Sequence, residues 1–568
     1  MKSVFSLDSN IIPEMEFERD IMRATGITLD LTRFALSFGG AVLSGIAVRG
    51  IRNPTARNLF STVVGFLLLY YPFGSHVLHG VITSLATYLV MWLIPRKCGT
   101  LAWLICFPYL TVLHVVNASG VNWNAGNLDF TGGQMVLTLK LISMAVCFQD
   151  ANSKKDEELS SYQRAHVFRS LPSLLEYLGF VFAFGNLLAG PVIEFRDYQM
   201  WANREGPWDP RAKRVPWTGD FAAGVRAFVT AVLSVSFYLY MERTWNFRLL
   251  ATPWYAAQPL LVKLVTMQAR RRGAGGGTAA RVVAAAAPAL PLRPRAARRG
   301  VRPAHAAAVA QVIGTTYRTR YYFAWSLGHC SLAFAGLDFL KWDSQTQAGV
   351  WGRCRNAQPL KVEFCDSSRL LAGYWNTTTG TFLRRYVYER LTVPGKKPTF
   401  VTLMVTQLVS GVWHGLYPGY IMFFAGSAIF FAHSTVLFNW ERAYVPPLLA
   451  RSPLWWAAKV FLTKQGLDFL AMAFLWLTWR ECVAAWASVH YLPLIYMSSV
   501  LVLGNVFPAR APRRAGGAAG AAGGDANGGG GGGDPVSGDH LHLGEGIKSA
   551  LVDGAASRPD LANGVKQD

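Results

Sequence analysis

Four long stretches of the sequence contain no Asp, Glu, Lys or Arg, and they constrain the fold more than any other feature. They are residues 58–95, 98–128, 398–440 and 482–509. A helix needs roughly 20 apolar residues to cross a bilayer, so the first and third stretches are each long enough for two crossings. Because lipid offers no hydrogen-bond partners, such segments must be helices or a closed barrel, and their continuous apolar character favours helices.

The composition agrees with an all-α, polytopic membrane bundle. Of the 568 residues, 52% are hydrophobic and 15% are charged, whereas a soluble domain carries about 25% charge. The apolar segments predict roughly ten to twelve spans, one of them at 249–267. Much of the net charge of +22 lies in loops beside the spans, as in cytoplasmic flanks that face anionic lipid. No basic domain stands apart from the spans, so nucleic acid is not an expected partner.

The chain divides into five parts. An N-terminal segment (1–30) precedes two core parts (31–267 and 315–508), and the low-complexity segments are 268–314 and 509–568. The first low-complexity segment is almost entirely Ala, Arg, Gly, Pro and Val, and the second is rich in Gly and Ala. Such compositions bury little side-chain structure, so we expect both to be disordered. The first is either a basic insert or non-coding sequence translated by a faulty gene model, and sequencing the transcript distinguishes the two.

Three charged residues fall inside or at the edge of apolar runs. They are Lys140, Glu176 and Arg226. Charges at membrane depth usually face a bundle interior or a water-filled cavity, which would indicate a polar chamber. The alternative is that they lie near the interface and extend their charged ends to water. The sequence leaves both interpretations open.

The most informative motif is VSGVWHGLYPGY, which places His414 well inside a charge-free run. Apolar surroundings favour the neutral imidazole, which can accept a proton as a general base but needs polar partners. Gly411, Gly415 and Gly419 recur every four residues and allow close helix packing, while Pro418 indicates a helix break. A buried structural histidine is the alternative, but the flanking Trp, Gly and Pro-Gly pattern favours catalysis.

A second motif, YWNTTTGTFLRRYVYER, precedes the first. Asn376 can both donate and accept hydrogen bonds, so it could orient a nucleophile or stabilise charge on a carbonyl oxygen. Arg384, Arg385 and Arg390 are interleaved with tyrosines and suit a phosphate group. Two alternatives remain, because Asn376 begins a glycosylation sequon and the arginines could simply anchor the chain at the membrane interface.

These motifs together resemble the membrane-bound O-acyltransferase family, in particular its lysophospholipid acyltransferase branch. Two upstream segments, DFTGGQMVL at 129–137 and AGPVIEFRDY at 189–198, fit the same branch. The resemblance covers about residues 30–508, apart from the segment 268–314, which departs from the family pattern. It implies a helical bundle around a chamber open to the cytosol and to the bilayer.

The resemblance also implies the chemistry and the site. His414 corresponds to the family's catalytic histidine and Asn376 to its asparagine partner. The implied substrates are acyl-CoA, a cosubstrate rather than a bound cofactor, and a lysophospholipid from the bilayer, with no metal ion. Residues near the two motifs are expected to contact the substrates: Trp375, Arg384, Arg385, Tyr388, Arg390, Trp413, Gly415, Tyr417 and Tyr420.

Other functions remain as alternatives. Within the family, the acceptor could be diacylglycerol, a sterol or a protein. From another class, a membrane transporter would also contain buried polar residues and broken helices. The sequence contains neither an HxxxxD motif nor a GxSxG motif of other acyl-transfer enzymes. Many spans and a cytosolic cosubstrate predict a multi-pass protein of the endoplasmic reticulum membrane, whereas the oligomeric state stays undetermined.

Overall fold

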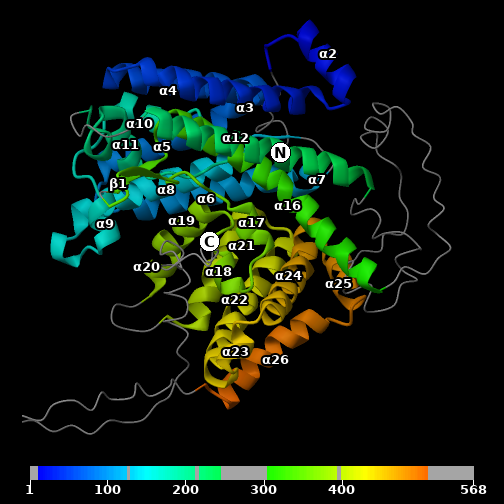
Figure 1. Ribbon diagram of the computed structural model, residues 1–568. Coiled ribbons are helices and arrows are strands. Elements are labelled where there is room, and N and C mark those ends of the chain that lie inside the picture. Colours follow the sequence, from blue (N-terminus) through cyan, green and yellow to red (C-terminus); the bar gives the residue numbers. More distant parts are fainter. Residues whose placement is uncertain are drawn as a thin grey trace, which may run out of the picture.

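The computed structural model describes residues 10–124, 128–210, 217–244, 303–343, 345–392 and 398–509. Nearly all of its regular structure is helical, as the apolar stretches predicted (Figure 1). The helices of the N-terminal part are α2 (Glu16–Thr25), α3 (Leu29–Ala47), α4 (Pro54–Phe73), α5 (Leu78–Leu93), α6 (Cys98–Val116), α7 (Ser119–Asn124), α8 (Thr131–Ser153), α9 (Ser161–His166), α10 (Leu174–Val181), α11 (Phe195–Asn203) and α12 (Trp217–Thr244). Short 3-10 turns join them: η1 (Val48–Gly50), η2 (Gly74–Val77), η3 (Asp156–Glu158) and η4 (Gly206–Trp208).

The C-terminal part begins with the long helix α16 (Pro303–Phe334). An antiparallel hairpin of β1 (Phe339–Asp343) and β2 (Ala348–Trp351) follows, with Phe339 paired to Trp351. The remaining elements are α17 (Pro359–Glu363), α18 (Ser368–Leu371), α19 (Thr377–Phe382), the π-helical segment η8 (Leu383–Tyr388), α20 (Glu389–Leu391), α21 (Phe400–His414), α22 (Pro418–Tyr444), α23 (Pro447–Ala450), α24 (Pro453–Trp476), α25 (Trp479–Ala487) and α26 (Leu492–Val506).

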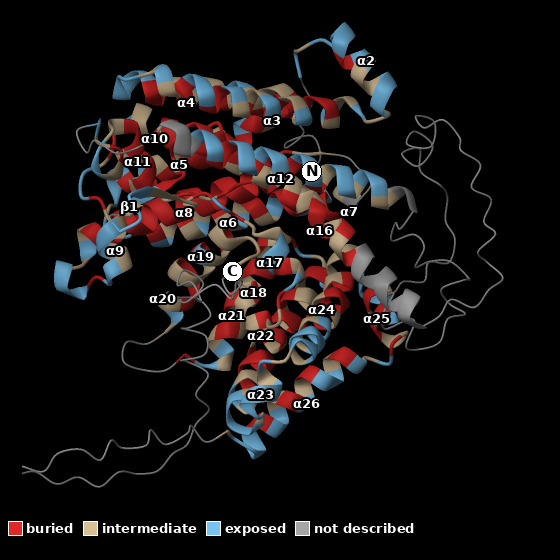
Figure 2. Cartoon of the chain, viewed as in Figure 1, coloured by how far each residue is buried: buried red, intermediate tan, exposed pale blue. Residues whose placement is uncertain are grey.

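The helices form two groups that α16 connects. In Figure 1, helices α3 to α12 occupy the upper part and helices α17 to α26 the lower part, and α16 runs from one to the other. Helix α16 packs on α12 and α3 at one end and on α24 at the other. The centre of the upper group is α8, which packs against α5 and α6 and is buried on nearly all sides (Figure 2). The lower group is built around α22, which contacts α21, α24 and α26.

The outward faces of the long helices are apolar, as expected for a surface that lies against lipid. Large hydrophobic side chains are exposed along α4, α6 and α12, for example Leu67 (57%), Leu104 (65%) and Leu233 (66%). Figure 2 shows these outward faces of α4 and α12 in pale blue while the opposite faces are buried. Exposure of such a surface to water would be unfavourable, whereas the hydrocarbon of a bilayer is as apolar as these side chains.

The described residues contain six helical stretches long and apolar enough to cross a membrane, or seven if the bent pair α25 and α26 is one span. One of the six, Pro54–Leu93, has 40 residues and combines α4 and α5, which is enough for two crossings at roughly 20 residues each. The expected span at 249–267 lies outside the described residues. Helices such as α16 and α24 carry buried charges and are too polar to count among these candidates. The expected total of roughly ten to twelve spans therefore stays a prediction.

The low-complexity segment 268–314 lies outside the described residues up to residue 302. From Pro303 onward, however, the chain is already helical as the start of α16, so the C-terminal boundary of the segment differs from the one expected at 314. The local sequence PAHAAAVAQV explains the difference. Proline is favoured at the first helical position, and alanine is the strongest helix former. The tail after residue 509 lies outside the described residues as well.

The three charges in apolar runs do not form a chamber. The ammonium of Lys140 is fully buried and donates to the backbone oxygens of Phe180 (2.6 Å) and Val181 (3.0 Å) and to Asn186 Oδ1 (3.0 Å). It therefore satisfies carbonyl groups at the C-terminal end of α10, which have no partner within that helix. Glu176 is half-buried, Arg226 is exposed, and neither lines the cavity described below.

Close packing of α4 on the segment after α10 gives a first test of the fold. A Cβ atom on Gly65 would lie 1.6 Å from the backbone oxygen of Phe182, so Gly65→Ala must displace the main chain. We expect a loss of about 1–3 kcal/mol in unfolding free energy, seen as a lower thermal transition of the purified protein in detergent. Gly39→Ala is the matched control, because a Cβ at Gly39 meets nothing within 4 Å. Equal stability of the two variants would contradict this packing.

Candidate active site

A cavity of about 290 Å³ lies among the helices of the lower group. Helices α16, α21, α22 and α24 wall it, together with the segment from α18 to η8. Its lining is largely apolar and aromatic, with Phe423, Phe424, Phe430, Phe431 and Phe474 among the rings. Both His414 and Asn376 line this cavity. Concave apolar sites with a few polar groups are typical of ligand-binding sites.

His414 is the last residue of α21 and sits among aromatic rings. Its imidazole stacks on Phe424 with ring centroids 5.0 Å apart and meets Phe474 (5.0 Å) and Tyr420 (5.7 Å) at steeper angles. Its ring accepts or donates no hydrogen bond within the part of the chain that the structure describes. None of the described residues therefore supplies the polar partner that the sequence predicted, and aromatic packing holds the ring. Its nitrogens remain available to a molecule in the cavity.

Glycines and a proline end α21 at His414. Gly415 has φ +128°, a value that L side chains rarely adopt, and its N–H bonds back to Gly411 O. Pro418 starts α22 at its first position, where a missing N–H costs nothing. A Cβ at Gly419 would lie 2.1 Å from Ala473 O, so this glycine lets α22 approach α24 closely. The sharp turn between α21 and α22 thus presents His414 to the cavity.

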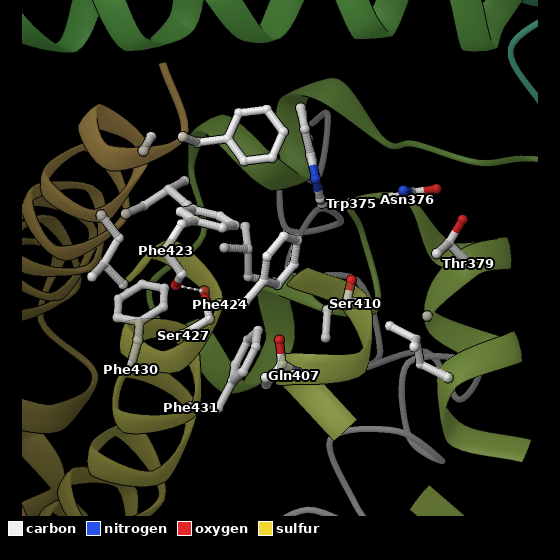
Figure 3. A pocket seen from close by; sticks show the side chains of 18 of the residues that line it. Trp375, Asn376, Thr379, Gln407, Ser410, Phe423, Phe424, Ser427, Phe430 and Phe431 are labelled. Carbon is white, nitrogen blue, oxygen red and sulfur yellow. Dashed lines mark hydrogen bonds between the residues drawn. The ribbon is translucent and has the colours of Figure 1, made fainter. Parts of the chain in front are cut away.

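Asn376 precedes α19 in the left-handed conformation (φ 46°, ψ 48°), which asparagine tolerates better than most residues. Its side-chain oxygen accepts a hydrogen bond of 3.0 Å from Asn356 Nδ2. The neighbouring Trp375 packs edge-on against Trp325, with centroids 4.9 Å apart, and also lines the cavity. Figure 3 shows the Asn376 amide with its nitrogen on the cavity side and its oxygen turned away.

The other predicted contact residues separate into two sets. Arg384 and Tyr388 line the cavity, as Trp375 does. The remaining six lie outside its lining: Arg385, Arg390, Trp413, Gly415, Tyr417 and Tyr420. Of these, Tyr420 packs directly on the His414 ring and Tyr417 packs on Tyr420.

Trp413 fixes helix α21 to the upper group. Its indole Nε1–H donates to Met135 O on α8 (3.0 Å), and its own carbonyl is 3.0 Å from His114 Nε2 on α6. The helix α21 therefore reaches across the boundary between the two groups, with His414 one residue beyond the anchor. His114 thereby supports the end of α21.

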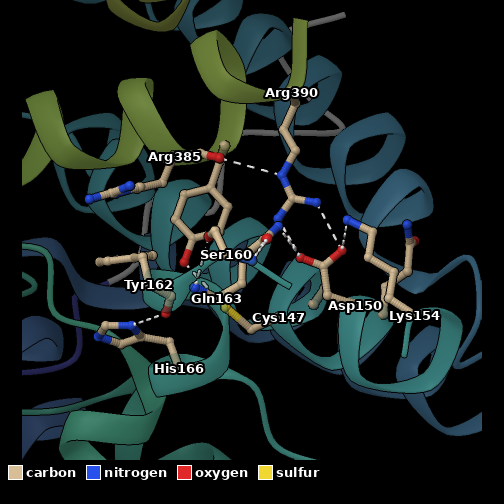
Figure 4. Close-up of polar contacts among 12 residues, drawn as sticks. Cys147, Asp150, Lys154, Ser160, Tyr162, Gln163, His166, Arg385 and Arg390 are labelled. Atoms are coloured by element: carbon tan, nitrogen blue, oxygen red, sulfur yellow. Dashed lines mark hydrogen bonds and ion pairs between the residues drawn. The ribbon is translucent and has the colours of Figure 1, made fainter. Parts of the chain in front are cut away.

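Arg385 and Arg390 belong to a polar cluster outside the cavity (Figure 4). Arg390 bonds both carboxylate oxygens of Asp150, with Nη1 2.8 Å from Oδ1, and the Asp150 side chain is only 2% exposed. Burial lowers the pKa of the Arg390 guanidinium, but Asp150 opposes this effect and the net shift is upward. Arg385 bonds Glu389 (2.8 Å) and covers the ring of Tyr162.

Glu194, from the upstream segment AGPVIEFRDY, lies in the same cluster. It accepts hydrogen bonds of 2.8 Å from the hydroxyls of Tyr162 and Tyr386. Burial raises the pKa of its carboxyl, although nearby His166 and the two tyrosine hydrogen bonds oppose the shift. The cluster thereby connects η8 to α8 and α9. This segment therefore has a structural partner in the arginine-rich motif, which the sequence alone did not indicate.

The Arg390–Asp150 pair predicts a stability effect. Among the described residues, Arg390→Gln leaves the buried Asp150 with Lys154, at 2.9 Å, as its one charged partner. We expect a loss of about 3 kcal/mol, measured as a lower thermal transition. The double variant Asp150→Asn/Arg390→Gln removes the uncompensated charge and should recover part of that loss. If Arg390 instead bound a substrate phosphate, the single variant would raise the KM for acyl-CoA at unchanged stability.

The structure adds polar residues to which the sequence motifs assigned no role. Ser410 lines the cavity one turn before His414, and Gln407 lines it two turns before, on the same face of α21 (Figure 3). Their helical spacing from His414 within an otherwise apolar run was a sequence signal that could have identified them. On another wall, Arg318 bonds Glu363 (2.7 Å) and Asp468 (2.5 Å) and thereby joins α16, α17 and α24. Asn356 carried no recognisable sequence signal.

Comparison with known proteins identifies relatives over most of the chain. The family model described as MBOAT, membrane-bound O-acyltransferase family, matches residues 116–270 and 297–463. Lysophospholipid acyltransferase 1 of Arabidopsis thaliana is 31% identical over 490 residues, which are 86% of this chain and 96% of that protein. Lysophospholipid acyltransferase of Schizosaccharomyces pombe is 26% identical, over 81% of this chain and 83% of that protein. The gap between the two matched ranges falls within the low-complexity segment.

Proposed function

Because the chain belongs to the membrane-bound O-acyltransferase family, we propose that it transfers a fatty acyl group from acyl-CoA to the free hydroxyl of a lysophospholipid. The names of the relatives support the acceptor, since both relatives given above are lysophospholipid acyltransferases. The apolar helices support a site that an acceptor enters from the bilayer.

His414 is the general base of the proposed reaction. Its ring nitrogen accepts the proton of the glycerol hydroxyl, and that oxygen attacks the carbonyl carbon of the thioester. The tetrahedral intermediate then collapses, the carbon–sulfur bond breaks, and the proton passes from the imidazole to the departing thiolate of CoA. A positioned general base typically contributes ~10²–10⁴-fold, and holding both substrates in one cavity contributes through proximity.

One observation carries the proposal. His414 and Asn376 belong to two separate motifs, and both line the same largely apolar cavity. A neutral histidine and a hydrogen-bond donor at one apolar site fit the needs of acyl transfer, in which a proton leaves an alcohol and charge develops on a carbonyl oxygen. The aromatic and apolar lining fits acyl chains.

The experiment supplies membranes that contain the protein with labelled acyl-CoA and a panel of lysolipids, diacylglycerol and a sterol, and identifies the products by mass. We expect labelled diacyl phospholipid from at least one lysophospholipid. Transfer only to diacylglycerol or to the sterol would replace the proposed acceptor. Flux of a solute across sealed vesicles without any acylated product would instead favour a transporter.

We place the protein in the endoplasmic reticulum membrane as a multi-pass protein. The six to seven apolar helical candidates among the described residues support the membrane, and a cytosolic acyl-CoA supports a compartment that faces the cytosol. Co-fractionation of the tagged full chain with endoplasmic reticulum markers is the expected result, and co-fractionation with plasma membrane would contradict it.

A further inference from the structure

We propose that Asn356 is a positioning residue that fixes the Asn376 amide so that its nitrogen, and not its oxygen, faces the reacting carbonyl. This inference rests on the proposed acyl transfer and specifies the role of Asn376 within it. The sequence left that role open between orienting the nucleophile, which needs an acceptor, and stabilising the oxyanion, which needs a donor. A chain of hydrogen bonds decides between the two.

This series of hydrogen bonds starts at a backbone group that can only act as a donor. The Thr378 N–H can only donate, and it donates to Asn356 Oδ1 at 3.0 Å. The oxygen of Asn356 is thereby identified, and its other terminal atom must be the NH₂ group. That NH₂ group donates to the Asn376 side chain at 3.0 Å, so the Asn376 atom that receives it must be the oxygen Oδ1.

A second set of contacts keeps Asn356 in place. Its backbone oxygen accepts from Thr377 N–H (3.0 Å), and its side-chain oxygen also accepts from the Thr378 hydroxyl (2.8 Å). The Thr378 hydroxyl oxygen in turn receives the N–H of Val192 (3.1 Å). Asn356 is only 3% exposed. Each of its side-chain atoms is therefore committed, and a rotated amide would place two NH groups or two oxygens against each other.

The consequence for Asn376 follows directly. Its oxygen is occupied, and its nitrogen donates to no described residue, since neither a hydrogen bond nor another interaction is found for it in that part of the chain. Figure 3 shows this nitrogen on the side of the cavity. An amide held in this way can donate to an oxygen on which negative charge develops, and it cannot accept a proton from the nucleophile. Asn356 does not line the cavity, so it acts through Asn376.

Three variants of the full chain in membranes test the inference, with initial rates normalised to folded protein. Asn356→Ala removes the donor and frees the Asn376 amide to rotate. We expect kcat to fall roughly 10–100-fold, by analogy with the loss of residues that orient metal ligands, with little change in KM. Asn356→Asp keeps the acceptor for Thr378 but attracts the Asn376 NH₂ group, so its kcat should fall at least as far. Thr377→Val is the matched control, because it loses only its bond to Arg355 O.

The deciding measurement is the double variant Asn356→Ala/Asn376→Ala. If Asn356 acts only through Asn376, adding Asn356→Ala to Asn376→Ala lowers kcat no more than about twofold. A multiplicative loss in the double variant, or parent-like kcat in Asn356→Asp, would overturn the positioning role while leaving the proposed acyl transfer intact. An inactive parent with every lysolipid would reject the proposed function itself and this inference with it.

Discussion

Membranes that contain the His414→Ala variant are expected to form labelled diacyl phospholipid at least ~10²-fold more slowly than parent membranes. The imidazole is the one basic group placed at the end of α21 against the cavity, and alanine leaves the acceptor hydroxyl without a proton acceptor. The ring has no hydrogen bond to a described residue. Its removal should therefore cost packing against Phe424 and Phe474 but leave no buried polar group unpaired.

A matched histidine separates this chemical loss from a loss of structure. His433 also lies buried in an apolar helix, α22, but outside the cavity lining. His433→Ala should change thermal stability and leave the rate per folded protein near the parent value. Retention of more than half of the parent rate by His414→Ala at normal expression would remove it as the base.

The second large effect is expected from Asn376→Asp, which changes one atom of the amide and hardly its shape. One carboxylate oxygen can still accept from Asn356 Nδ2, but the other would face the cavity in place of the donor. It would repel the developing oxyanion, so we expect kcat to fall ~10²–10³-fold, as for the loss of an oxyanion-hole donor. If Asn376 instead accepted a hydrogen bond from the nucleophile, the aspartate would retain much of the activity.

The glycosylation interpretation of Asn376 has its own outcome in the same experiment. Both Asn376→Asp and treatment of the parent with a glycosidase would shift the mobility of the protein on a gel if a glycan were attached there. Because the Asn376 side chain bonds Asn356 and lines the cavity, we expect no such shift. A shift with unchanged kinetics would show that the asparagine carries a sugar and not the reaction.

The sequence predicted the helical fold because charge-free apolar runs leave few alternatives in lipid. It also singled out His414 and Asn376, since unusual polar residues in glycine- and tryptophan-rich frames stand out against an apolar background. Family assignment confirms the class of protein, whereas the roles of these two residues remain predictions that the variants above test.

Side-chain partners could not be read from local patterns. Arg384 lines the cavity, while Arg390, six positions later, turns to Asp150 on α8. Arg384 lies in the π-helical segment η8, which ends before Arg390 and changes the direction of successive side chains relative to an ordinary helix. Lys140 similarly resembled a chamber residue and instead caps α10. Such pairings depend on contacts between residues far apart in the sequence, which neither periodicity nor composition encodes.

If an alcohol and a thioester meet in the cavity of His414, the release of CoA must match the formation of phospholipid in stoichiometry. Purified protein in lipid nanodiscs is supplied with labelled acyl-CoA, with or without a lysophospholipid. We expect one free CoA thiol for each diacyl phospholipid formed, no release without the acceptor, and neither product from His414→Ala. Undiminished, acceptor-dependent CoA release by His414→Ala, matched by phospholipid, would contradict this expectation.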